Sequence, residues 1–215
     1  MFFVDGGVNM SKEAVNLFID FEFTMPERGN KYIGFYPEII EVGAILVEND
    51  KVLKEFSSYV KPEAFPILSK RCKSFLSIKQ EDIDNGISFE QLINELRELT
   101  NCKPCNIITW GNMDMKVLRQ NCNKLALDFP FYGQEIDLSI EYKQFFGDKN
   151  QTGLWKAVQA YGKEGSGKQH RALDDALTTF SIFRLVEKDK KYLQRPKPTT
   201  IGERIDLSEL MNIFA

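Results

Sequence analysis

The chain has 215 residues, a length typical of one large domain with a substantial hydrophobic core. Its composition, 43% hydrophobic and 27% charged residues, is that of a soluble globular protein. The net charge of -3 and the sequence pI of about 5.4 argue against a protein that coats long duplex nucleic acid, because such proteins are usually basic. An enzyme that grips a few nucleotides at an acidic metal centre is compatible with this charge.

The sequence does not have the features of a membrane protein or of a secreted protein. No apolar run reaches the roughly 18–20 residues that span a bilayer. Residues 1–7 lack the basic and apolar regions of a signal peptide. We therefore expect a cytoplasmic protein.

The four cysteines do not indicate redox or zinc chemistry. Cys102 and Cys105 have the spacing of a redox pair, but they precede an apolar strand, whereas a redox pair normally opens a helix. Cys72, Cys122 and the single histidine supply no second matching pair of zinc ligands. We expect reduced thiols.

Three strands are predicted near the N-terminus, at residues 15–24, 39–47 and 52–60. A loop at 26–37 and a turn at 48–50 separate them, so an antiparallel meander is expected.

Helices and short strands follow. The expected strand covers 106–110, and the expected helices or helical pieces cover 68–75, 79–83, 88–99, 115–122, 153–161 and 172–187, with a strand or helix at 135–146. This order predicts an α/β fold with helices packed against a mixed sheet. We expect an irregular lead-in (1–13), one domain (14–188) and a C-terminal tail (189–215) that packs on the domain.

Two acids, Asp20 and Glu22, interrupt the apolar run Val15–Thr24. Residues two apart in a strand share a face, so both carboxylates project side by side from a strand in which acids are rare. Such a pair loses hydration and repels unless a cation compensates it, and the run holds no Lys or Arg. A divalent metal ion is one explanation. The alternative is an edge strand whose acidic face lies in solvent.

Two later segments offer further ligands. Asp114 follows a predicted strand at the sheet edge where open α/β sheets place their sites, although Asp is also common at a helix N-terminus. Asp175 lies five residues after His170, the only histidine. Five residues are about 140° apart on a helix. We therefore expect His170 in the loop that follows the Gly-rich segment 162–168, and Asp175 in the first turns of the helix.

Together, Asp20-x-Glu22, Asp114 after Trp-Gly-Asn-Met, and His170-x4-Asp175 resemble the motifs of the DEDDh 3′-to-5′ exonucleases. Phe-Glu-Phe-Thr, Pro-Glu-Ile-Ile-Glu and Trp-Gly-Asn-Met-Asp are similar to the Eri-type branch, and longer stretches are similar to its bacterial KapD-like members. The resemblance implies a ribonuclease H-like fold, in which an antiparallel meander and parallel strands form one mixed β-sheet flanked by α-helices.

The resemblance also implies a mechanism. Two Mg²⁺ or Mn²⁺ ions, roughly 3.5–4 Å apart, would clamp the scissile phosphate at a 3′ end. Asp20 would bridge both ions. Glu22 and Asp175 would help to hold the ion that activates water, and Asp114 would support the other. His170 would be the general base, since an unperturbed histidine pKa of about 6.5 suits proton transfer at neutral pH. The products would be nucleoside 5′-monophosphates.

The terminal nucleotide is expected to stack on apolar side chains, because stacking tolerates any base. The candidate substrate-binding residues are Phe23, Thr24, Met113, Leu76 and, for upstream phosphates, Arg171.

The expected partner is the 3′ end of single-stranded RNA, with no membrane association and no obligate protein partner. Two alternatives stay open. One is the same chemistry on DNA ends, since sugar choice depends on contacts to the 2′-hydroxyl. The other is a non-catalytic regulator that keeps the fold and binds a protein; no metal-ligand position is lost here, which favours catalysis.

Overall fold

The computed structural model describes residues 15–29 and 33–194. The predicted lead-in and the tail beyond residue 194 lie outside these ranges. The chain divides into two compact units, Met1–Phe183 and Arg184–Ala215. The sheet and all candidate site residues belong to the first unit, and the predicted domain limits stay predictions.

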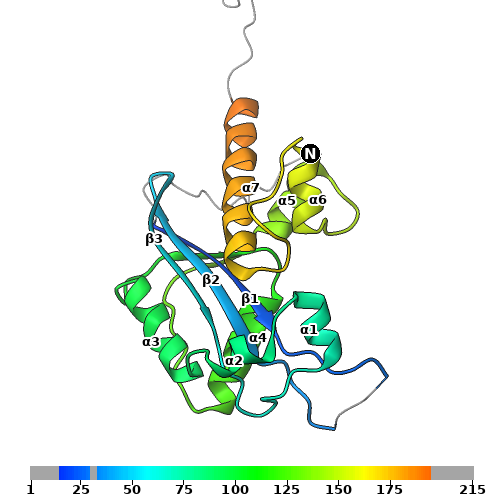
Figure 1. Cartoon of the computed structure of the whole chain (residues 1–215). Coiled ribbons are helices and arrows are strands. Elements are labelled where there is room, and N and C mark those ends of the chain that lie inside the picture. Colours follow the sequence, from blue (N-terminus) through cyan, green and yellow to red (C-terminus); the bar gives the residue numbers. More distant parts are fainter. Residues whose placement is uncertain (1–14, 30–32, 195–215) are drawn as a thin grey trace, which may run out of the picture. The chain divides into compact units, whose positions relative to one another are not determined.

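Five strands form one mixed sheet in the order β3-β2-β1-β4-β5 (Figure 1). The strands are β1 (Asn16–Phe23), β2 (Ile39–Glu48), β3 (Lys51–Tyr59), β4 (Asn106–Thr109) and β5 (Glu135–Asp137). Neighbours in β1–β2 and β2–β3 run antiparallel, whereas β1–β4 and β4–β5 run parallel. The predicted meander and the predicted mixed sheet are both confirmed.

Seven helices are described: α1 (Lys70–Leu76), α2 (Gln80–Asp84), α3 (Phe89–Leu99), α4 (Met113–Lys124), α5 (Leu138–Phe146), α6 (Leu154–Ala160) and α7 (Ala172–Leu193). Helix α4 begins at Met113, earlier than expected, which puts Asp114 in its first turn. Residues 135–146 hold both a strand and a helix. Helix α7 continues past the expected end to Leu193, because its Lys-rich last turns are good helix formers without an apolar stripe.

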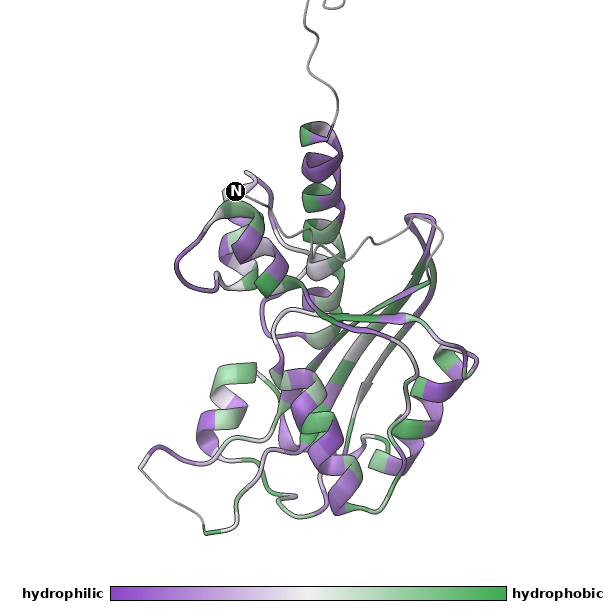
Figure 2. Cartoon of the chain, turned by 180° about the vertical axis from the view of Figure 1, so that it is seen from behind, coloured by the Kyte–Doolittle hydropathy of each residue, from purple (hydrophilic) through white to green (hydrophobic). Residues whose placement is uncertain are grey.

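The two faces of β1 pack on different helices. Leu17, Ile19 and Phe21 lie in a buried cluster with apolar residues of α3 and α4. Helix α3 supplies an apolar stripe to that cluster, and Figure 2 shows hydrophobic and hydrophilic residues alternating along it. On the other face, the Phe18 ring lies 5.0 Å from the Phe180 ring of α7. By the alternation of a strand, Asp20 and Glu22 share this α7 face.

Helix α7 approaches the sheet closely at Gly43. This glycine pairs with Asp20 across β1 and β2. A Cβ atom built on Gly43 would lie 1.9 Å from the backbone nitrogen of Leu173 and 2.1 Å from the backbone carbon of Ala172. Only glycine therefore allows the first turn of α7 to lie directly against the centre of the sheet, beside Asp20.

Within the described ranges, no helix combines the length and the apolar character that a membrane span requires.

Candidate active site

Two carboxylates leave β1 on the face that packs against α7. Asp20 is half-buried, and Glu22 is 8% exposed. Across the antiparallel pair, Asp20 lies opposite Gly43 and Glu22 lies opposite Glu41. Directly paired residues of an antiparallel sheet share a face, so Glu41 also points to the α7 side. Three acids thus crowd one face of the central strands.

A third element brings Asp114 to this group. Strand β4 pairs with β1 over Asn16–Phe18, so the pairing stops before Asp20. The chain then turns into α4, and the Asp114 carboxylate accepts a hydrogen bond from the Phe21 backbone N–H at 3.1 Å. This bond joins the first turn of α4 to the peptide between Asp20 and Glu22. The site therefore lies at the carboxyl ends of parallel strands, as expected for an α/β sheet.

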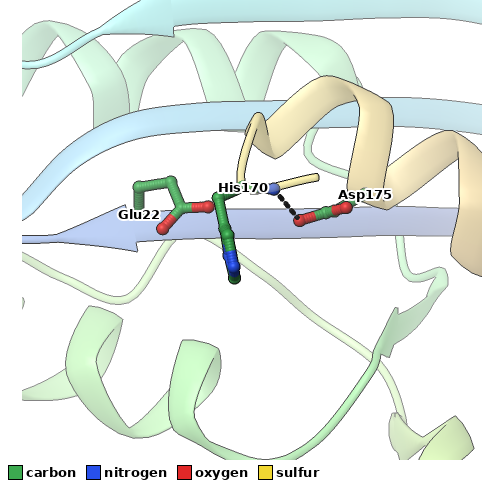
Figure 3. A group of neighbouring side chains, drawn as sticks. All are labelled: Glu22, His170 and Asp175. Carbon is green, nitrogen blue, oxygen red and sulfur yellow. Dashed lines mark hydrogen bonds between the residues drawn. The ribbon is translucent and has the colours of Figure 1, made fainter. Parts of the chain in front are cut away.

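The fourth element is the start of α7. Asp175 is buried, and both of its carboxylate oxygens accept hydrogen bonds, from the Trp155 indole N–H at 2.7 Å and from the His170 backbone N–H at 3.1 Å. His170 lies in the loop before α7, as expected. One possible ligand atom from each of Glu22, His170 and Asp175 lies within 4.8 Å of the others, and Figure 3 shows the histidine between the two acids.

Burial raises the pKa of every carboxyl group in the cluster, and repulsion from other members adds to the shift for Asp20, Glu22 and Asp114. Burial raises the pKa of Glu22 to about 8, and Asp175 adds to the shift. Burial raises the pKa of Asp114 to about 7, although the hydrogen bond from Phe21 opposes it. The pKa of Asp20 is well above its usual value, because burial and then the Asp114 and Glu22 charges disfavour its ionised form. Burial also raises the pKa of Asp175.

The cluster fits divalent cations. Four carboxyl groups from β1, α4 and α7 repel one another at close range, so a bound cation would relieve a charge conflict that the fold itself creates. Carboxylate oxygens are ligands that suit Mg²⁺ and Mn²⁺. The spacing within Glu22, His170 and Asp175 is comparable with the span of one ion's ligand shell.

The backbone of His170 is unusual. Its φ of +63° lies in the left-handed region, which residues other than glycine rarely adopt. The imidazole ring lies 4.4 Å from the Phe75 ring of α1. A strained backbone and an aromatic contact together fix the direction of this side chain at the edge of the carboxylate cluster.

The candidate residues for base and phosphate contacts differ in accessibility. Met113 is 54% exposed at the start of α4, which leaves it open to a ligand. Thr24 is buried, and its hydroxyl accepts a hydrogen bond from the Glu38 N–H. Phe23 packs against the cluster under α3 and α4, on the face away from Asp20, and Leu76 is 2% exposed in a separate core cluster.

Arg171 does not point free into solvent. Its Nε–H donates to Glu41 Oε1 at 3.0 Å, and its guanidinium carbon lies 5.2 Å from the centre of the Tyr59 ring. Its role in binding upstream phosphates stays a prediction.

Four residues near the site carried no signal that sequence reasoning used. Trp155 and Glu41 act through side-chain contacts between distant segments. Phe75, at 52% exposure, contacts the His170 ring, whereas its neighbour Leu76 is the residue predicted to bind the terminal nucleotide. Asp137 accepts the Gly111 N–H at 3.0 Å and so holds the turn before Asp114. The pairing of Glu22 with Glu41 was the available clue, since it follows from the register of the predicted hairpin.

A five-stranded mixed sheet flanked by helices, with acids gathered at the carboxyl ends of its parallel strands, is the ribonuclease H-like fold of the DEDDh exonucleases. The profile of the exonuclease (RNase_T) family matches residues 17–183. The chain belongs to this family, as a 3′-5′ exonuclease of the DEDDh type. The predicted family, fold and enzyme class are confirmed, and the family uses divalent metal ions.

Individual relatives support the same family assignment. The chain is 58% identical over 195 residues to the probable 3′-5′ exonuclease KapD of Bacillus subtilis (strain 168), covering 91% of this chain and 95% of that one. It is 32% identical over 200 residues to human ERI1 exoribonuclease 2, covering 80% of this chain but only 28% of the human protein. The nuclease domain of 3′hExo, a DEDDh family member solved with bound rAMP, superposes with a TM-score of 0.74 at 28% identity, covering 83% of this chain and 94% of that domain.

Proposed function

We propose that this exonuclease removes nucleoside 5′-monophosphates from the 3′ ends or overhangs of single-stranded RNA, with two Mg²⁺ or Mn²⁺ ions. The observation that carries the proposal is the convergence of four acids and the only histidine from β1, α4 and the start of α7. Nothing else in the described segments gathers so many buried, mutually repelling carboxyl groups.

Asp20, Glu22, Asp114 and Asp175 would hold the ions. When bound, divalent ions supply positive charge to the scissile phosphate and make water a better nucleophile. The Trp155 N–H and the His170 backbone N–H orient the Asp175 carboxylate, and the Phe21 N–H orients that of Asp114.

His170 would be the general base. Its imidazole lies beside Glu22 and Asp175, where it can take the proton of the attacking water. The Phe75 ring contacts the imidazole on the side of α1.

The terminal base would stack on the exposed side chains beside the acids. Met113 is one, and Phe75, which is exposed beside His170, is a second apolar surface. The names of the exoribonuclease relatives and the rAMP bound to 3′hExo support RNA. DNA ends are the alternative outcome of the test below.

The test uses matched single-stranded RNA and DNA oligomers labelled at the 5′ end, incubated with Mg²⁺, with Mn²⁺ or with chelator. We expect a ladder that shortens from the 3′ end, depends on the metal ion and is faster on RNA. Asp20→Asn should abolish the ladder, because the isosteric amide keeps the shape but not the charge. A faster ladder on DNA would reverse the sugar preference, and no ladder on either strand or on 3′ overhangs by folded wild type would refute the proposal.

A further inference from the structure

Glu41 and Arg171 form an ion pair beside the site. The Glu41 side chain is 2% exposed, and its Oε1 accepts the Arg171 Nε–H at 3.0 Å. Among residues 15–29 and 33–194, its other oxygen, Oε2, has no hydrogen-bond partner. A buried carboxylate is costly, and Arg171 is the cation that compensates it. Breaking the pair would leave an uncompensated charge inside the protein.

The ion pair connects β2 to the loop before α7. Glu41 lies in β2, opposite Glu22 of β1 on one side and Tyr59 of β3 on the other. Arg171 lies between His170 and the first residue of α7, and its guanidinium lies over the Tyr59 ring. The pair therefore ties the histidine loop to the central strands at the row of residues that carries Glu22.

The loop that carries His170 requires a contact of this kind to hold its backbone conformation. His170 has a left-handed backbone, a conformation that costs on the order of 1 kcal/mol or more in a residue with a side chain. The segment before it, 162–168, is rich in glycine, and the N–H groups of Ser166 and Lys168 bond to side chains of α7, not to the sheet. The bond from the His170 N–H to Asp175 fixes one side of the histidine, and Arg171 is the adjacent residue on its other side.

We propose that Arg171 and Glu41 are positioning residues, which hold the His170 imidazole over the carboxylate cluster by joining its loop to the sheet. This inference rests on the proposed exonuclease function. It gives Arg171 a different role from a contact with substrate phosphates, because its Nε–H is committed to a buried acid and its side chain is only 35% exposed.

A double-mutant cycle separates the two roles. The variants are Arg171→Gln, Glu41→Gln, the double variant and Arg171→Lys. Glutamine has the shape of glutamate, so Glu41→Gln keeps the packing, whereas Arg171→Gln leaves the Glu41 carboxylate uncompensated and should cost stability. Urea denaturation checks that each variant is folded under the assay conditions. If the pair positions His170, each single variant should lower kcat by roughly 10–100-fold with little change in KM. The double variant should then be no less active than the less active of the two single variants. Arg171→Lys should recover part of the loss, because it keeps the charge.

A phosphate contact predicts a different pattern. Arg171→Gln would then raise KM most at low salt and make KM less dependent on salt, whereas Glu41→Gln would leave KM unchanged, and the two effects would add. That result overturns the proposal. Unchanged kcat in both single variants also overturns it.

The second readout needs neither metal nor activity. His170 is the only histidine, so the untagged protein gives one imidazole Cε1–H resonance in an NMR spectrum. The nearby Phe75 ring should shift this resonance in the wild type. We expect Arg171→Gln and Glu41→Gln to move it to the same new position in chelator, and an unmoved resonance contradicts positioning. If wild type degrades no nucleic acid, the proposed function fails, while the resonance still decides whether the pair holds the histidine.

Discussion

The Asp114 carboxylate accepts a hydrogen bond from the backbone N–H of Phe21, the residue between Asp20 and Glu22. The bond is possible because β4 pairs with β1 over Asn16–Phe18, which leaves the N–H of Phe21 free to meet the first turn of α4. A backbone group of the strand thus fixes the carboxylate that the next element supplies. This contact makes the spacing between the acids a property of the sheet rather than of a loop.

The raised pKa values predict how stability without metal depends on pH. Folding raises the pKa of Glu22 from 4.5 to about 8 and that of Asp114 from 3.8 to about 7. Between the unfolded and folded pKa values, the folded state binds more protons than the unfolded state. The contribution of these two groups to the free energy of unfolding is therefore greatest near pH 4, and it falls as the pH rises toward about 7 for Asp114 and about 8 for Glu22. Calorimetry in chelator should show a falling Tm across this window.

Two comparisons control that measurement. Glu22→Gln should flatten the fall, since the amide does not ionise, and it should raise the Tm in chelator at alkaline pH. Mg²⁺ or Mn²⁺ should stabilise wild type most at alkaline pH, where the carboxylates are ionised. A Tm that rises with pH in chelator between 5 and 8 and ignores Glu22→Gln would contradict the charge conflict.

Gly43→Ala should be strongly destabilising. The added methyl group would lie 1.9 Å from the Leu173 backbone nitrogen, so the first turn of α7 must move away from the sheet. We expect a loss of about 1–3 kcal/mol or more in urea denaturation, together with a lower kcat, because Asp175 moves with the helix. Gly153→Ala is the matched control, since a Cβ atom there has no neighbour within 4 Å. Equal stability of the two variants would refute the close approach.

Trp155→Phe removes the indole N–H that donates to Asp175 at 2.7 Å. We expect a loss of about 1–3 kcal/mol in stability and weaker metal binding, because the carboxylate loses the donor that orients it. Mn²⁺ affinity measured by electron paramagnetic resonance checks the second effect on folded protein. If the variant binds Mn²⁺ as tightly as wild type, Trp155 only packs.

Phe75 and Leu76 should respond differently to truncation although they are neighbours. Phe75 is 52% exposed beside His170, whereas Leu76 is 2% exposed in the core. Leu76→Ala should cost about 2–5 kcal/mol of stability. Phe75→Ala should leave stability nearly unchanged, raise KM and lower kcat. The reverse pattern, an effect of Leu76 on KM in a stable protein, would support the original candidate.

Much of the fold could be predicted because strand and turn signals are local. The apolar run 39–47, the alternation in 52–60 and the turn between them define the hairpin, and the register between β1 and β2 sets which acids share a face. The end of α7 was missed for the opposite reason. Its last turns are polar, so helical propensity rather than an apolar pattern carries them to Leu193.

The candidate site could be predicted in its acids but not in their supports. Asp20 and Glu22 stand out because charges are rare in a buried strand. Glu41 lies in the motif Pro-Glu-Ile-Ile-Glu, but its bond to Arg171, a residue 130 positions away, does not follow from the local sequence. The sequence also does not show which of Phe75 and Leu76 is exposed, because that depends on how α1 is rotated against the core.

The chemical identity of the first product shows whether the enzyme hydrolyses the 3′-terminal phosphodiester. Single-stranded RNA labelled in its last nucleotide is mixed with the enzyme and Mg²⁺ or Mn²⁺ and quenched within the first turnovers. We expect the label to leave as a nucleoside 5′-monophosphate while the remaining strand becomes one nucleotide shorter, and we expect Asp20→Asn to release none. Label that appears in longer fragments or as a nucleoside 3′-monophosphate would contradict hydrolysis of the terminal phosphodiester at this carboxylate cluster.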